Sequence, residues 1–246
     1  MILLLCSLLW ASPSESWTRA SEAAAQGDYV AAAAQYRELL QQGVVHENVY
    51  YNLGNSLYRQ NRLGEAVLAW RRAAVLAPRD PDVQANLAFA RRKLRDDLRP
   101  VDSSPWFAPW QAFLSVGEGC YLGAGLLGVG LVIFGLRRRL PGTPEAPAAL
   151  LAAFGALVWG AAIYQDQRTD AGVVLAEEVT VSSELSGGVE LFRLHLGAEV
   201  ELGERVGGYC LVRLPDGRKG WVLEDKLGSV DPSAAFPAGA NPATPG

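Results

Sequence analysis

Residues 119–136 read GCYLGAGLLGVGLVIFGL, and residues 146–165 read APAALLAAFGALVWGAAIYQ; neither stretch contains a charged side chain. At about 1.5 Å of rise per residue, the first stretch would extend roughly 27 Å as a helix, close to the ~30 Å hydrocarbon core of a bilayer. A buried helix of a soluble protein can be equally apolar. Two such stretches joined by a short turn with Pro and Gly favour a two-helix transmembrane hairpin over residues 113–165.

The residues between the two stretches indicate how the hairpin is oriented. Arg137, Arg138 and Arg139 begin the connecting turn, and short loops rich in Arg and Lys stay on the cytoplasmic side of a membrane. The parts of the chain before and after the hairpin are then expected on the opposite side. Residues 1–16 hold a short apolar run followed by small residues, which predicts a signal peptide or leader, with a frayed helix as the alternative.

Residues 17–99 repeat with a period of 34, and the clearest copy is 47–80. A period of this length, with small residues facing large ones, indicates helix pairs stacked into an α-helical solenoid. This copy resembles the tetratricopeptide repeat (TPR). The matching positions are Tyr50, Leu53, Gly54, Leu57, Ala66, Trp70, Ala73 and Pro78. Residues 81–98 look like a further first helix that caps the stack.

In the TPR family the first helix of each repeat lines a concave face that binds protein partners. The resemblance therefore implies a binding groove on this chain. Its expected residues are Tyr51, Asn52, Asn55, Tyr58, Arg59, Phe89, Arg92 and Lys93. Amide groups pair with the backbone of an extended peptide, rings supply apolar contact, and cations suit an acidic segment or a free carboxylate. The alternative is that the tyrosines only pack against neighbouring repeats and the cations keep the surface soluble.

After residue 170 the apolar pattern changes to period two, which is typical of strands. Five or six short strands with Gly-rich turns lie within 171–230 and predict a small all-β barrel that is complete in itself. The segment 208–222, GYCLVRLPDGRKGWV, resembles bacterial SH3-like domains, whereas 182–185 departs from their usual sequence. The resemblance implies core positions for Tyr209 and Trp221 and a short helical turn at 224–227. Residues 100–112 are expected to be a linker, and 231–246 a disordered tail.

No arrangement of residues predicts catalysis. His46 and His195 have no nucleophile or carboxylate at a motif spacing, and the chain has neither a phosphate-binding glycine loop nor clustered metal ligands. Cys6, Cys120 and Cys210 have no metal-site spacing. A net charge of −4 without a dense basic face argues against nucleic-acid binding. We therefore expect a binding protein, not an enzyme, with no cofactor and no metal.

The whole order of leader, TPR pair, hairpin and barrel is similar to the TPR/SH3 membrane proteins of bacterial aerotolerance (Bat) operons. This resemblance implies a multidomain scaffold in the bacterial inner membrane, with both soluble domains in the periplasm and the arginine-rich loop in the cytoplasm. It also implies protein partners, namely von Willebrand factor A-type membrane proteins and a MoxR-type ATPase system, besides membrane lipid around the spans. The alternative function is a cell-envelope sensor that binds peptidoglycan through the SH3-like domain.

Overall fold

The computed structural model describes residues 12–96, 116–136, 145–166, 171–185 and 188–237. Two compact units make up the chain. The two ends of the sequence, Met1–Asp102 and Asp170–Gly246, form the first unit, and Ser103–Thr169 forms the second. Most of the predicted leader, the linker at 100–112, the loop with Arg137, Arg138 and Arg139, and residues 238–246 lie outside the described residues.

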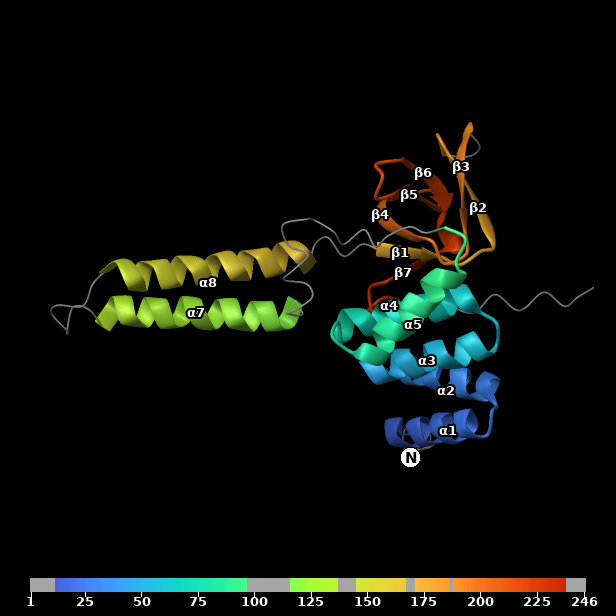
Figure 1. The fold of residues 1–246 in the computed structure, drawn as a ribbon, viewed down its shortest axis with the longest axis horizontal. Coiled ribbons are helices and arrows are strands. Elements are labelled where there is room, and N and C mark those ends of the chain that lie inside the picture. Colours follow the sequence, from blue (N-terminus) through green and yellow to red (C-terminus); the bar gives the residue numbers. More distant parts are fainter. Residues whose placement is uncertain (1–11, 97–115, 137–144, 167–170, 186–187, 238–246) are drawn as a thin grey trace, which may run out of the picture. The chain divides into compact units, whose positions relative to one another are not determined.

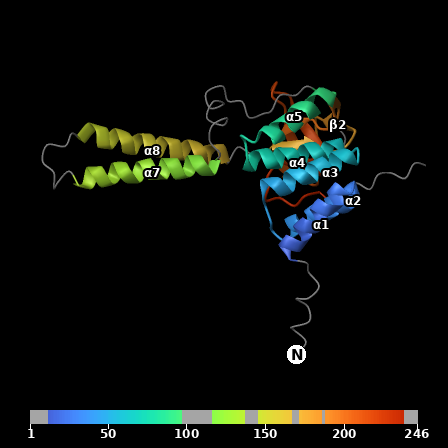
Figure 2. The ribbon, with the colours of Figure 1, turned by 60° about the horizontal axis from the view of Figure 1, so that its bottom comes forward.

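The first unit begins with five helices that stack one on the next (Figures 1 and 2). They are α1 (Pro13–Ala25), α2 (Tyr29–Gln41), α3 (Glu47–Arg59), α4 (Leu63–Leu76) and α5 (Pro81–Lys93). Ser12 and Glu15 form a capping box at the start of α1, so the first repeat begins at Pro13 instead of residue 17. The first helices of the repeats thus start at 13, 47 and 81, which keeps the period of 34 throughout.

The residues of the TPR pattern hold the helix pairs together. Seven of the eight predicted positions are buried, and Pro78 is half-buried just after the end of α4. A Cβ atom added to Gly54 would lie 2.5 Å from Cδ1 of Trp70, so α3 and α4 approach too closely for any larger residue. The turn inside each repeat uses the same left-handed backbone, at Gly27 (φ 81°) and at Asn61 (φ 62°), 34 residues later.

The second part of this unit is one antiparallel sheet of seven strands in the order β3-β2-β6-β5-β4-β1-β7. The strands are β1 (Ala171–Val174), β2 (Glu178–Ser182), β3 (Glu190–His195), β4 (Glu199–Val206), β5 (Tyr209–Arg213), β6 (Lys219–Leu223) and β7 (Leu227–Ser229). A 3-10 turn, η2 (Glu224–Lys226), occupies the predicted helical turn. The additional strand, β7, has only three residues and a central glycine, so it gives no period-two signal.

The core of the sheet differs from the prediction at two aromatic residues. Cys210 and Val212 on β5, and Val222 on β6, are buried in it. Tyr209 and Trp221 alternate with these residues along their strands, so they lie on the outer face, where they are half-buried. They are therefore not core residues of the sheet.

The sheet packs directly on the repeats and is not a separate body. Val173 and Val230 belong to the same cluster of buried residues as the helices. A Cβ atom at Gly228 would lie 2.5 Å from a methyl group of Leu68 on α4. Helix α4 is consequently buried on the side that faces its own repeat and on the side that faces the sheet (Figure 1).

Charged groups complete this repeat–sheet joint, by which we mean the contact of α4, α5 and Asp96 with the sheet. Glu199 is only 6 % exposed, and its carboxylate lies 3.1 Å from Nε of Arg71 and 3.7 Å from Nη2 of Arg91. Asp96 accepts hydrogen bonds from the backbone N–H of His195 (2.7 Å) and pairs with its Nδ1 (2.9 Å). Ionic groups thus hold the sheet on the repeats at two points.

The beginning of the predicted disordered tail has a defined position. We call residues 231–237 the C-terminal strap; it leaves β7 and lies along α2, α3 and α4, where Phe236 packs near Tyr50. The expectation of disorder is thus corrected for these residues. The strap has few apolar side chains, which is why the sequence predicts disorder. One aromatic ring and several backbone carbonyls nevertheless fix it on the repeats.

The second unit is an antiparallel hairpin of α7 (Val116–Leu136) and α8 (Glu145–Asp166). The helices meet at small residues: a Cβ atom at Gly123 would touch the backbone of Trp159, and one at Gly130 that of Ala152. Residues 117–136 are long and apolar enough to cross a membrane, with a mean hydropathy of 2.0, while the apolar part of α8 covers only 147–161. Within the described residues, length and composition therefore support one span more strongly than two.

Candidate functional site

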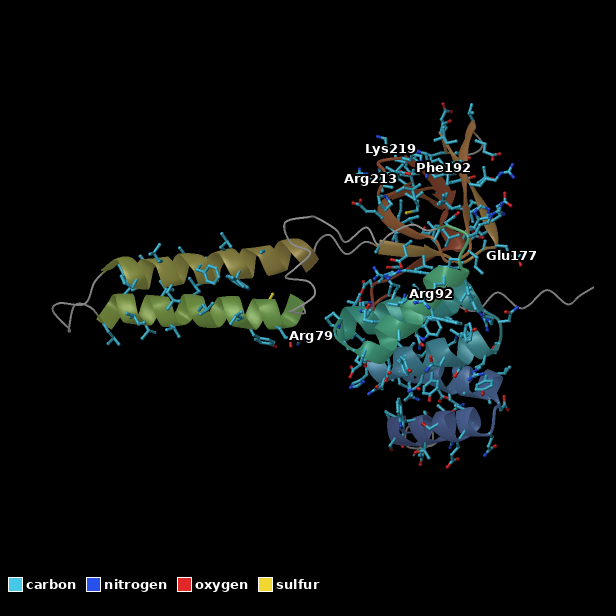
Figure 3. All side chains as sticks on the ribbon, in the orientation of Figure 1. Arg79, Arg92, Glu177, Phe192, Arg213 and Lys219 are labelled. Carbon is cyan, nitrogen blue, oxygen red and sulfur yellow. The ribbon has the colours of Figure 1, made fainter. Side chains whose placement is uncertain are left out.

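The candidate groove consists of the eight predicted residues on the first helices α3 and α5. Tyr51, Asn52, Asn55, Tyr58 and Arg59 lie on α3; Phe89, Arg92 and Lys93 lie on α5 (Figure 3 labels Arg92). Four of these residues are exposed and the other four are half-buried. The exposed ones are Arg59 on α3 and Phe89, Arg92 and Lys93 on α5. The structure therefore brings residues from two successive repeats to one surface.

An aromatic and cationic cluster joins the two helices. The Tyr58 and Phe89 rings meet edge to face with centroids 5.6 Å apart, a favoured aromatic geometry. Nζ of Lys93 lies 5.2 Å and 4.8 Å from the centroids of these rings and donates a hydrogen bond of 2.8 Å to the Tyr58 hydroxyl. Lys93 is thus positioned by the rings, and its charge remains at the surface.

Asn55 is used for packing on its acceptor side. Its Oδ1 accepts hydrogen bonds from Nε1 of Trp70 (3.1 Å) and from Nδ2 of Asn86 (2.9 Å). The sequence pattern did not single out Asn86, because an isolated asparagine in a capping helix carries no signal. The Asn55 side chain thereby connects α3, α4 and α5. A role of Asn55 in binding a peptide would use its amide N–H groups.

The remaining predicted residues divide by exposure. The Asn52 amide donates to the Asn48 carbonyl of its own helix (2.9 Å), and Tyr51 packs against the buried cluster of the repeats. Arg59 lies over the ring of Tyr29, with Cζ 5.8 Å from the centroid. Arg92 is exposed. The exposed cations at the two ends of the surface are therefore the groups most available to a partner.

Residues 47–80 match the tetratricopeptide repeat family. The matched segment spans α3 and α4 and contains five of the eight groove residues. Searches of curated proteins and of solved structures found no significant match. TPR repeats are protein–protein interaction modules and are typically non-catalytic, so this part of the chain is a protein-interaction scaffold.

The two histidines have structural partners. His46 is the N-cap of α3, where its Nδ1 accepts a hydrogen bond from the backbone N–H of Asn48, and His195 pairs with Asp96 at the repeat–sheet joint. Among the described residues, no group of three or more His, Cys, Asp or Glu side chains is arranged to hold a metal ion. Burial raises the pKa of the Cys210 thiol, which disfavours the reactive thiolate.

Proposed function

We propose that this chain is a non-catalytic, membrane-anchored scaffold that binds a protein partner in the groove between α3 and α5. The observation that carries the proposal is the TPR match at 47–80, together with the aromatic and cationic cluster of Tyr58, Phe89 and Lys93 on the adjoining first helices. An extended segment with acidic side chains or a free carboxylate fits this surface. Arg59, Arg92 and Lys93 give it positive charge and the rings give it apolar contact area.

Membrane anchoring is the second part of the proposal, and the hairpin supports it. Residues 117–136 have the length and hydropathy of a span, and the close packing at Gly123 and Gly130 is typical of helices that associate in lipid. The repeats and the sheet, which precede and follow the hairpin, form one compact unit. If both helices cross the membrane, the repeats and the sheet must lie on the same side of it, which agrees with a cytoplasmic loop containing Arg137, Arg138 and Arg139.

The cellular context of the proposal comes from the resemblance to the membrane proteins of Bat operons. On that basis we propose the bacterial inner membrane as the location, with the compact unit in the periplasm. The partners proposed on the same basis are von Willebrand factor A-type membrane proteins, which act with a MoxR-type ATPase system in a stress-related complex.

Substitution of the two exposed arginines tests the groove. Asn55 is unsuitable for this purpose because its removal would disturb Trp70 and Asn86. We expect the double variant Arg59→Ala with Arg92→Ala to lose most of the partner that co-purifies with the tagged chain from detergent-solubilised membranes, while the circular dichroism spectrum stays unchanged. The matched control removes two exposed cations elsewhere, Arg19→Ala with Lys219→Ala. Equal partner recovery with both double variants would exclude the groove as the docking site.

Site-directed labelling tests the topology. Asp82 on α5 and Glu204 on β4 are both exposed, and Thr143 belongs to the loop between the two helices. In cells with an intact inner membrane, a membrane-impermeant maleimide should label cysteines placed at 82 and 204 but not at 143. Labelling at 143 alone would invert the proposed topology. Labelling at 82 but not 204 would mean that only one helix crosses the membrane and that the repeats and the sheet are not packed together there.

A further inference from the structure

The C-terminal strap contacts the repeats through a buried arginine on α4. Arg72 is fully buried, yet no carboxylate lies within ion-pair distance of it in the part of the chain that the structure describes. Backbone carbonyls take that place: Ser229 accepts from Nε (3.0 Å) and Nη2 (2.8 Å), Ala234 accepts from Nη1 (2.8 Å), and Ala235 accepts from Nη2 (3.3 Å). Two of these three carbonyls belong to the strap.

A tyrosine on α3 binds a further carbonyl of the strap. The Tyr50 hydroxyl donates a hydrogen bond of 2.6 Å to the Pro232 carbonyl and accepts one from Nη1 of Arg72 (3.4 Å). Carbonyls at 232, 234 and 235 are therefore all bound by two side chains of the repeats. Because these are backbone groups, the contacts require a chain that turns at 231–234 in this position but no particular side chains at 234 and 235.

The side chain that adds selectivity is Phe236. Its ring centroid lies 5.2 Å from Cζ of Arg72, 5.6 Å from Cζ of Arg37 and 6.4 Å from the Tyr50 ring. Two guanidinium groups on α2 and α4 thus face one aromatic ring, an arrangement that favours an aromatic residue over an aliphatic one. Glu65 holds Arg37 in place through an ion pair of 2.9 Å.

We propose that Arg37, Tyr50 and Arg72 form a second peptide-binding site, on α2, α3 and α4 and separate from the groove, for a segment that turns as the strap does and carries an aromatic residue after the turn. The C-terminal strap is its ligand within the same chain. The strap is held as a peptide ligand is held: it pairs with no strand, its residues alternate between exposed and half-buried, and a turn fixed by Asp231 and Ser233 shapes it locally. The proposal does not depend on the groove or on membrane anchoring.

Covalent connection explains why the strap occupies this site. It follows β7 directly, and β7 is fixed on the repeats, so the effective concentration of the strap at the site far exceeds that of a free peptide. A partner segment of the same chemistry therefore reaches the site only when the strap is released or shortened.

The site can be tested by supplying the strap as a separate peptide. The receptor is the chain ending at Val230, purified in detergent, which keeps the Ser229 carbonyl and the buried Val230 side chain. The probe is a fluorescently labelled peptide of residues 231–238, DPSAAFPA, followed by fluorescence anisotropy. We expect saturable binding to the shortened chain and at least about tenfold weaker binding to the intact chain, in which the strap competes; tenfold corresponds to roughly 1.4 kcal/mol.

A matched peptide with Phe236→Ala should bind the shortened chain at least about tenfold more weakly, since it loses the ring between the two guanidinium groups. Equal affinity of the two peptides, or no binding to a shortened chain that keeps its circular dichroism spectrum, would overturn the proposal. If the shortened chain does not fold, the full-length Phe236→Ala variant decides. This variant should bind the wild-type peptide more tightly than the wild-type intact chain does. The control is Leu223→Ala, which changes an exposed apolar residue on β6. No gain in binding for the Phe236 variant would also refute the site.

Discussion

Replacing Glu199 with Gln removes the carboxylate from the repeat–sheet joint at almost constant volume. Arg71 is 9 % exposed and Arg91 is partly exposed, so the substitution removes a carboxylate that lies 3.1 Å from a nearly buried guanidinium group. Breaking a buried ion pair by removing one partner costs about 3–5 kcal/mol. The glutamine oxygen still accepts one hydrogen bond, so we expect about 3 kcal/mol, the lower end of that range.

This free energy converts into a measurable shift in the melting temperature. The first unit has about 150 described residues, and for that size 1 kcal/mol corresponds to about 2–4 °C. Thermal unfolding of the full-length chain in detergent, followed by near-ultraviolet circular dichroism, should therefore show Tm lowered by roughly 6–12 °C. Glu204→Gln on the same strand is the control, because Glu204 is exposed and its loss should shift Tm by no more than about 2 °C.

A second variant separates the ion pair from simple packing. Replacing both partners with apolar residues, Arg71→Met with Glu199→Leu, removes both buried charges of the pair together, so this double variant should be more stable than Glu199→Gln alone. If Glu199→Gln melts within 2 °C of the Glu204→Gln control, the carboxylate does not stabilise the joint and the reasoning fails.

Three further perturbations test other parts of the fold. Gly54→Ala should destabilise the repeats by about 1–3 kcal/mol, because the new methyl group would lie 2.5 Å from Trp70. Adding Trp70→Phe to that variant should restore part of the lost melting temperature, followed by the helical circular dichroism signal, and no recovery would contradict the close contact. Cys210 is 1 % exposed and burial raises the pKa of its thiol, so iodoacetamide at pH 8 should modify it only when urea unfolds the chain; fast modification in native buffer would show an open sheet. Gly155→Leu should separate α7 from α8 in SDS titrations, because its side chain would enter the backbone at Leu127, whereas Gly128→Leu, with open space around it, should not.

The helical repeats could be predicted from the sequence because the residues that contact one another lie close together in the chain. Gly54 and Trp70 lie within one 34-residue copy, and the contact between them is specified inside that copy. The start of the first repeat was missed by four residues because Ser12 and Glu15, which cap α1, lie in a stretch of small residues that also suits a cleavage site.

The strands of the sheet were predictable from period two, but the face that each residue occupies was less so. Tyr209 and Trp221 are large and aromatic, which suggested a core position, yet the alternation with Cys210 and Val222 puts them on the outer face. A shift of one residue in a strand exchanges the two faces, so residue type alone does not decide burial.

Contacts between segments that are far apart in the chain could not be predicted from the sequence. Arg91 and Glu199 each look like solvated surface charges in their own segments, and nothing near either one indicates that the other will neutralise it. In the candidate groove, the sequence pattern does not reveal that the side-chain oxygen of Asn55 accepts hydrogen bonds from Trp70 and Asn86.

The hydrogen bond between Arg72 and the Ala235 carbonyl joins residues 163 positions apart. This separation delays the formation of the hydrogen bond during synthesis of the chain. At roughly 5–20 residues per second, about 8–33 s pass between translation of the two residues. For much of that interval the ribosome has already delivered α4, but the sheet and the strap that cover Leu68 and Arg72 are not yet complete. A nascent chain halted after the hairpin therefore carries finished repeats with one uncovered face, which marks it as incomplete to any chaperone or protease that recognises exposed apolar surface.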